Sequence, residues 1–111
     1  MVGRKMFYVL LVEHHDWVRD TTVKGLEAEG FCKVVHVPTA SEAIEQLGVM
    51  NPDLVLVNPE AEGMKDLALV SRFQALLDLT GAKVVLTSGI PIENLDSVLA
   101  EEIGKVTLTA N

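Results

Sequence analysis

The stretch Pro52-Asp53-Leu54-Val55-Leu56-Val57-Asn58 decides the fold of this chain. Its apolar run is short and continuous, and Pro52-Asp53 marks its beginning, a pattern typical of a parallel strand buried on both faces. In an open α/β sheet, binding and chemistry gather just beyond the carboxyl ends of the strands, where Asn58 stands. A carboxylate at that place could attack a phosphoryl donor. An amide cannot, because its nitrogen lone pair is delocalised and its oxygen carries no formal charge.

Further strand-like runs lie on both sides of this stretch. They cover residues 7–12, 33–37, 83–87 and 105–109. The runs at 7–12, 54–57 and 83–87 are apolar almost throughout, which predicts strands that helices cover on both faces. The sequence therefore predicts a sheet of five strands.

Helical patterns separate the predicted strands. Helices are expected over about 16–29, 39–48 and 65–79, and a fourth is expected between Pro91 and Gly104. Asp16 is the expected amino-terminal cap of the first helix, and Thr39 that of the second, where Glu42 follows at capping-box spacing. Strands that alternate with helices predict right-handed βαβ crossovers and a parallel sheet, so residues 1–111 are expected to form a single domain.

The last predicted strand ends close to Asn111, and no helix follows it. A sheet with helices on both faces would then lack part of its cover. Because burial of apolar surface is worth about 25 cal/mol per Å², we expect a homodimer that covers the exposed surface. The alternative is a chain truncated from a longer parent that supplies the final helix. The sequence leaves both interpretations open.

Composition and charge narrow the classes of function. Hydrophobic residues make up 49% of the 111 residues, enough for one continuous core. The net charge of -7 disfavours non-specific nucleic-acid binding, which needs a basic surface. No apolar stretch approaches the length of about 18 residues that spans a membrane. Cys32 has no partner for a disulfide and is expected to be a core or edge residue in a reducing compartment, so we expect a cytoplasmic protein.

Polar residues follow the predicted strands at their carboxyl ends. Glu13 and His14 follow the first strand, Asn58 the third, Thr87 closes the fourth, and Ala110 follows the fifth. Because the carboxyl ends of parallel strands meet at one edge of the sheet, we expect these side chains to surround a single site.

The chain resembles the receiver domain of two-component response regulators over essentially its whole length. This resemblance implies a flavodoxin-like, three-layer α/β/α fold with strand order 2-1-3-4-5, here without the final helix. It rests on the following segments: Val9-Leu10-Leu11-Val12-Glu13-His14, Gly30-Phe31, Ala40-Ser41-Glu42-Ala43-Ile44, residues 52–58, Gly63-Met64, and Val84-Val85-Leu86-Thr87-Ser88-Gly89.

The resemblance also implies a role for each strand end. The pair of acids that helps to hold Mg²⁺ in receivers falls on Glu13 and His14, and the phosphoryl acceptor falls on Asn58. The hydroxyl that contacts the phosphate falls on Thr87, and the lysine falls on Ala110. Mg²⁺ prefers anionic oxygen ligands, and a lysine would pair with a bound phosphate. We therefore expect no phosphorylation of Asn58, weak or absent Mg²⁺ binding through Glu13, and no other cofactor.

The resulting hypothesis is a pseudo-receiver in phosphorelay signalling that acts through protein–protein contact and is not an enzyme. Its expected partners are a histidine kinase, an output protein or a second copy, docking on the fourth helix and fifth strand. One alternative is an authentic receiver that is phosphorylated at Glu60 or Asp53. Another is a small flavodoxin-like enzyme or ligand-binding domain, although the chain has no Gly-rich phosphate loop and no nucleophile–base pair.

Several residues also have simpler interpretations. His14 and His15 are adjacent, so on a strand end they are expected to point in opposite directions rather than to form a transition-metal site. A buried His14 next to Glu13 would be a candidate pH sensor. Glu13 is expected mainly to accept hydrogen bonds within its loop, and Trp17 to pack against the core. The charged residues between positions 60 and 66 are expected to be solvated.

Overall fold

A computed structural model describes residues 6–28, 30 and 32–87 of the chain. Its elements alternate in the order β1 (Phe7–Val12), α1 (Asp16–Glu27), β2 (Cys32–Val37), α2 (Ala40–Leu47), β3 (Leu54–Val57), α3 (Leu67–Thr80) and β4 (Lys83–Leu86). The expected fourth helix after Pro91, the strand at 105–109 and Ala110 lie outside the described residues. None of the described helices has the length and apolarity needed to cross a membrane.

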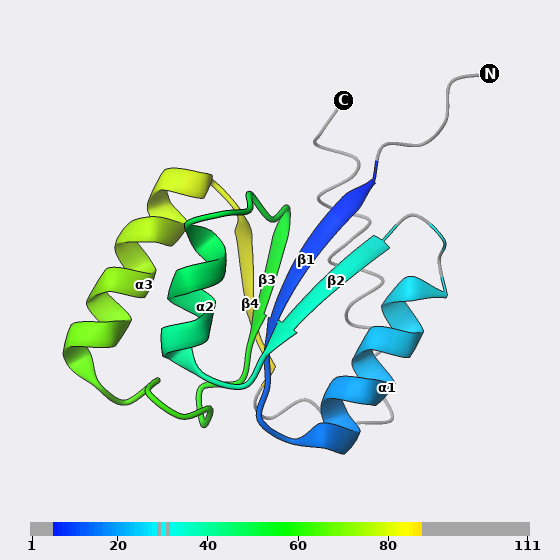
Figure 1. The fold of residues 1–111 in the computed structure, drawn as a ribbon, viewed down its shortest axis with the longest axis horizontal. Coiled ribbons are helices and arrows are strands. Elements are labelled where there is room, and N and C mark those ends of the chain that lie inside the picture. Colours follow the sequence, from blue (N-terminus) through cyan, green and yellow to red (C-terminus); the bar gives the residue numbers. More distant parts are fainter. Residues whose placement is uncertain (1–5, 29, 31, 88–111) are drawn as a thin grey trace.

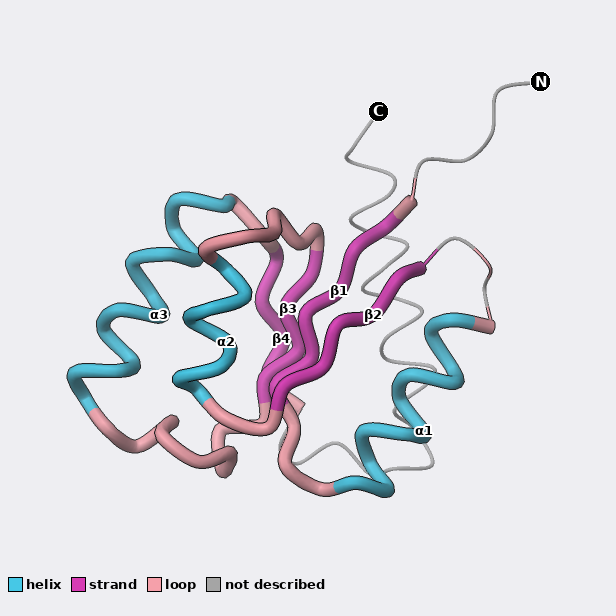
Figure 2. Tube along the Cα trace, viewed as in Figure 1, coloured by secondary structure: helices cyan, strands magenta, loops and turns pink. Residues whose placement is uncertain are grey.

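The described strands form one parallel sheet in the order β2-β1-β3-β4, which confirms this part of the predicted topology (Figure 1). Helix α1 covers one face of the sheet, and helices α2 and α3 cover the other (Figure 2). The predicted three-layer α/β/α architecture is therefore present in the described part of the chain.

The core is built around β1 and β3, whose apolar runs are buried between the helical layers. All residues of β3 are buried, and β1 exposes only Tyr8. Burying one side chain of Val or Leu size contributes about 1.5–3 kcal/mol, so these two strands supply much of the core. Cys32 is buried at the start of β2, as expected for a core or edge residue. On the far face, Phe73 and Leu77 of α3 pack against the sheet.

Strand β4 differs from the expectation that helices cover it on both faces. It lies at the edge of the described strands, and its apolar residues Val84 and Leu86 are 37% and 58% exposed. An apolar composition alone therefore does not bury this strand among the described residues.

The helix ends follow local chemistry, with two corrections to the prediction. Thr39 caps α2 as predicted, because its hydroxyl accepts the backbone N–H of Glu42. Asp66 caps α3 and accepts two backbone N–H groups, so this helix begins later than expected. The expected cap Asp16 is wrong, because His15 holds the extended N-cap position and Asp16 is the first helical residue. Its carboxylate instead pairs with Arg19 on the next turn, 3.1 Å away.

Candidate functional site at the carboxyl ends of the strands

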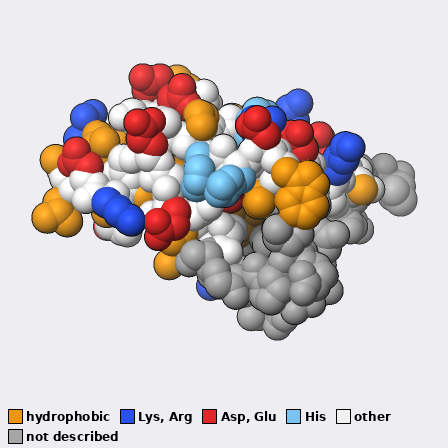
Figure 3. All heavy atoms as spheres, turned by 90° about the horizontal axis from the view of Figure 1, so that it is seen from below, with side chains coloured by type: hydrophobic (Ala, Val, Ile, Leu, Met, Phe, Trp, Pro, Cys, Tyr) orange, Lys and Arg blue, Asp and Glu red, His pale blue; other side chains and the backbone are white. Residues whose placement is uncertain are grey.

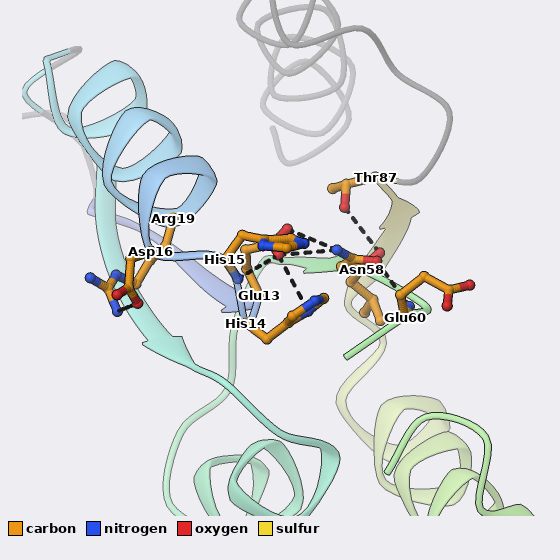
Figure 4. A network of polar contacts seen from close by, with 9 residues as sticks. Glu13, His14, His15, Asp16, Arg19, Asn58, Glu60 and Thr87 are labelled. Carbon is orange, nitrogen blue, oxygen red and sulfur yellow. Dashed lines mark hydrogen bonds and ion pairs between the residues drawn. The ribbon is translucent and has the colours of Figure 1, made fainter. Parts of the chain in front are cut away.

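The register of the sheet brings Glu13, Asn58 and Thr87 into one row. Val12 of β1 pairs with Val57 of β3, and Val57 pairs with Leu86 of β4. The candidate residues are the next ones along each strand, so they meet at the carboxyl edge of the sheet (Figure 4). Residues far apart in the sequence thus come together as the sequence predicted.

Glu13 is buried, with only 3% of its surface exposed, and its carboxylate accepts several hydrogen bonds. The Asn58 side-chain nitrogen Nδ2 donates to both oxygens, at 3.2 Å to Oε1 and 3.0 Å to Oε2. The backbone N–H of His15 donates to Oε2 at 3.0 Å. A buried charge is costly unless hydrogen bonds compensate it, and here donors surround the carboxylate. Glu13 therefore accepts hydrogen bonds within its loop, as its simpler interpretation requires.

The amide of Asn58 is held at both of its ends. While Nδ2 faces Glu13, the oxygen Oδ1 accepts the backbone N–H of Glu60 at 2.9 Å. The backbone carbonyl of Asn58 accepts the N–H of Ala61 at 3.0 Å, which closes the turn after β3. This hydrogen bonding fixes which end of the amide points inward: the donor faces the buried carboxylate, and the acceptor faces the loop.

Thr87 uses its hydroxyl within the sheet. Its Oγ1 donates to the carbonyl of Val57 at 3.4 Å, and its backbone N–H donates to the same carbonyl at 2.9 Å. Thr87 is half-buried and lies at the carboxyl edge of the sheet, next to Asn58 in the strand register.

The histidines and Trp17 differ from their predicted placement. The rings of His14 and His15 do not point apart, since their centroids are 4.1 Å from each other. His14 is exposed rather than buried, although its Nδ1 lies 3.6 Å from Glu13 Oε2. Trp17 is 62% exposed instead of packed. Figure 3, seen from the carboxyl ends of the strands, shows histidine side chains gathered on this face.

The described residues do not fit a bound Mg²⁺. This ion needs oxygen ligands turned toward it, but both Glu13 oxygens face the Asn58 amide nitrogen. The Asn58 oxygen is turned outward to the N–H of Glu60. Within the described residues, no three His, Cys, Asp or Glu side chains are grouped so that they could hold a metal ion.

The alternative acceptors lie away from this pair. Asp53 is at the opposite end of β3, where its carboxylate accepts the backbone N–H of Tyr8 at 2.8 Å. Glu60 pairs with Lys65 at 3.1 Å, and Figure 4 shows its side chain pointing away from Glu13. Neither carboxylate therefore takes the place of Asn58 beside Glu13.

Arg19, on α1, is engaged by its own helix. Its guanidinium bonds to Asp20 and Asp16, and the hydrogen bond to Asp20 raises its pKa above the ordinary value for arginine. Figure 4 shows this group apart from Asn58. Arg19 therefore does not provide a cation beside the candidate acceptor position.

The partners of the Asn58 amide were missed by sequence reasoning. The sequence Asn58-Pro59 carried a usable signal, because an Asn side chain often bonds the backbone N–H two residues later in an Asx turn. That bond places Oδ1 on Glu60 and leaves Nδ2 for Glu13. No sequence signal identified the N–H of His15 as a further donor.

Solved structures similar to this chain include response regulator receiver domains. A CheY-like receiver domain from Methylobacillus flagellatus superposes with a TM-score of 0.62 at 19% identity, covering 87% of this chain and 98% of that chain. The MaeR response regulator bound to beryllium trifluoride superposes with a TM-score of 0.63 at 18% identity, covering 85% of this chain and 77% of that chain. An orphan response regulator of H. pylori superposes with a TM-score of 0.59 at 19% identity, covering 89% of this chain and 98% of that chain.

No protein-family model matches the sequence, and no curated protein is significantly similar to it. The similarity is therefore one of structure, at 18–19% sequence identity to these three proteins. The chain therefore has the fold of a response regulator receiver domain.

Proposed function

We propose that this chain is a receiver domain of two-component signalling that acts through protein contacts, without phosphorylation of Asn58. The receiver fold supports the signalling role. The Asn58 amide supports the second part, because it occupies the acceptor position and its nitrogen faces Glu13 at 3.0 Å. On this proposal the chain is not an enzyme and works in the cytoplasm with a histidine kinase or an output protein.

The amide is the observation that carries the proposal. Phosphoryl transfer to a side chain requires an oxygen nucleophile with electron density to donate. The only oxygen of the Asn58 side chain is neutral and accepts the Glu60 N–H at 2.9 Å. The neighbouring Glu13 carboxylate is buried beneath the amide and engaged by its donors. Neither group is a free nucleophile.

Intact-mass measurement after incubation with acetyl phosphate and Mg²⁺ tests this proposal. We expect no added phosphoryl group on the wild-type chain. A mass shift of one phosphoryl group, located at any residue of the carboxyl edge, would overturn the proposal. A receiver with an acidic acceptor, treated in parallel, controls for active reagent.

Beryllium fluoride provides an independent probe. The structurally similar MaeR response regulator is bound to beryllium trifluoride. For the present chain we expect the backbone amide signals of residues 13, 58 and 87 to remain unchanged on addition of beryllium fluoride with Mg²⁺. A saturable change at these signals would contradict the proposal even if acetyl phosphate failed to react.

Association of two copies is part of the same proposal. Strand β4 presents Val84 and Leu86 to solvent, whereas the matching apolar runs of β1 and β3 are buried. Sedimentation should show a concentration-dependent dimer that Leu86→Glu weakens. Exposed Leu67 on α3 gives the matched control, because Leu67→Glu adds the same charge away from β4. A monomer at all concentrations would remove the homodimer from the proposal.

A further inference from the structure

We propose that the Glu13–Asn58 pair joins the ends of β1 and β3 without any metal ion, and that it works only as one carboxylate with one amide. This inference rests on the receiver-type function proposed above and specifies how its strand-end site is held together. The amide nitrogen of Asn58, at the end of β3, bridges to the carboxylate of Glu13, at the end of β1.

The first step concerns the burial of Glu13. Its side chain is 2% exposed, so water contributes little to its solvation. A buried carboxylate is tolerated when hydrogen bonds to the charged form replace its hydration. The Asn58 amide provides such bonds to both oxygens, and the His15 N–H adds another. The pair therefore satisfies the carboxylate with neutral donors from the chain itself.

The second step concerns polarity. A side-chain amide has a donor end and an acceptor end, whereas an ionised carboxylate only accepts. Asn58 uses both ends, with Nδ2 on Glu13 and Oδ1 on the Glu60 N–H. An aspartate at position 58 could keep the bond from Glu60 but would turn an acceptor toward Glu13. Two facing carboxylates repel each other unless a proton or a cation intervenes.

The third step concerns the loop after β3, which we define as residues 59–63. Asn58 fixes its beginning through Glu60, and the carbonyl of Glu62 accepts the N–H of Ala40 at 2.9 Å. Ala40 is the first residue of α2. The Glu13–Asn58 pair thereby connects the end of β1 with the amino terminus of α2 through one loop. Asn58 is a positioning residue for this loop.

Exchanging the two groups tests the proposal. In the double variant Glu13→Gln/Asn58→Asp, the amide introduced at position 13 can donate through its nitrogen to the carboxylate introduced at position 58. The oxygen of that amide can accept the His15 N–H, and the second oxygen of the carboxylate can still accept the Glu60 N–H. The double variant therefore retains the pair with its polarity reversed, whereas each single variant has either two carboxylates or two amides.

Thermal unfolding in EDTA should give the following order. Asn58→Asp should lower the melting temperature by about 10 °C or more, and Glu13→Gln should lower it less. The double variant should melt well above Asn58→Asp. Asn51→Asp serves as the control, because Asn51 is exposed and the substitution adds the same charge away from the pair. Hydrogen exchange at the Glu60 amide should become faster in Asn58→Asp and slow again in the double variant.

Three results would overturn the inference. A double variant that is no more stable than Asn58→Asp, or that does not fold, would show that polarity is not what matters. Fast exchange at the Glu60 amide in the wild-type chain would show that the pair does not hold the loop. A wild-type melting temperature that rises on replacing EDTA with Mg²⁺ would show that the site takes an ion. Phosphorylation by acetyl phosphate would instead overturn the proposed function and leave the rescue experiment valid.

Discussion

The two ends of β3 join this strand to β1 by opposite chemistry. At the amino end, the carboxylate of Asp53 accepts the backbone N–H of Tyr8 at 2.8 Å, in an exposed position. At the carboxyl end, the amide of Asn58 donates to the carboxylate of Glu13, which is buried. The same strand thus uses an acid where its partner is a donor, and an amide where its partner is an acid.

This difference shows that the partner decides which side chain suits each end. An exposed carboxylate opposite an N–H group keeps contact with water, so little desolvation opposes it. A buried carboxylate opposite another carboxylate would have neither water nor a donor. The burial of Glu13 therefore accounts for an amide at position 58.

The largest effect is expected from giving both ends of β3 an acid. Asn58→Asp should reduce the free energy of unfolding by about 3 kcal/mol, because it removes the donors to a buried charge and adds a like charge. Asn51→Asp, at an exposed position, should change it by about 0.5 kcal/mol or less. Urea unfolding of both variants in EDTA measures the difference. Equal stabilities would show that burial of Glu13 does not decide the residue at position 58.

The strands of this comparison were predictable from the sequence. The continuous apolar runs of β1 and β3 admit burial on both faces, and the structure places both strands at the centre of the sheet. Thr39 was also identifiable as a cap, because the capping pattern is local and involves residues three apart. Such features depend on neighbours along the chain, which the sequence displays directly.

Features that depend on tertiary neighbours were harder to predict from the sequence. Within the described residues, β1 is almost entirely buried and β4 is largely exposed, although both have apolar runs. An aspartate can serve either as an N-cap or as an acidic residue in the first turn of a helix. Only the extended backbone of His15 shows that Asp16 is a first-turn residue. The exposure of Trp17 likewise depends on which face of α1 packs against the sheet and which face is turned to solvent.

The candidate site shows the same division. Parallel pairing was enough to predict that Glu13, Asn58 and Thr87 meet at one edge. The orientation of the Asn58 amide was not predictable from spacing, because it depends on a backbone N–H and on a carboxylate 45 residues earlier in the chain. Only the structure shows which end of the Asn58 amide donates to Glu13 and which end accepts from Glu60.

A second prediction tests the loop that distinguishes the carboxyl end of β3. Gly63 has a φ of +88°, and a Cβ atom there would lie 3.0 Å from the Cβ of Ala40. Gly63→Ala should cost about 2 kcal/mol through backbone strain and this close contact. Gly81 has a similar φ of +69° but open space around it, so Gly81→Ala should cost only about 1 kcal/mol. If both substitutions cost the same in urea unfolding, the packing of the loop against α2 contributes nothing.

A third prediction concerns the amino end of β3. Asp53→Ala removes the acceptor of the Tyr8 N–H and should cost about 1 kcal/mol. Asp53→Asn keeps an oxygen acceptor and should cost less than about 0.5 kcal/mol. Acid and amide are thus expected to be nearly interchangeable at this end, in contrast to position 58. A large loss in Asp53→Asn, measured by the same unfolding experiment, would remove the contrast between the two ends.

The smallest effect is expected at Thr87, which follows the neighbouring strand β4. Its hydroxyl bonds the Val57 carbonyl at 3.4 Å, but its backbone N–H already bonds the same carbonyl at 2.9 Å. Thr87→Val keeps the side-chain shape and the backbone bond, so it should reduce the free energy of unfolding by only about 0.5 kcal/mol. A loss as large as that of Asn58→Asp would show that the hydroxyl takes part in holding the carboxyl edge together. The Glu13–Asn58 pair would then be one part of a larger network extending to β4.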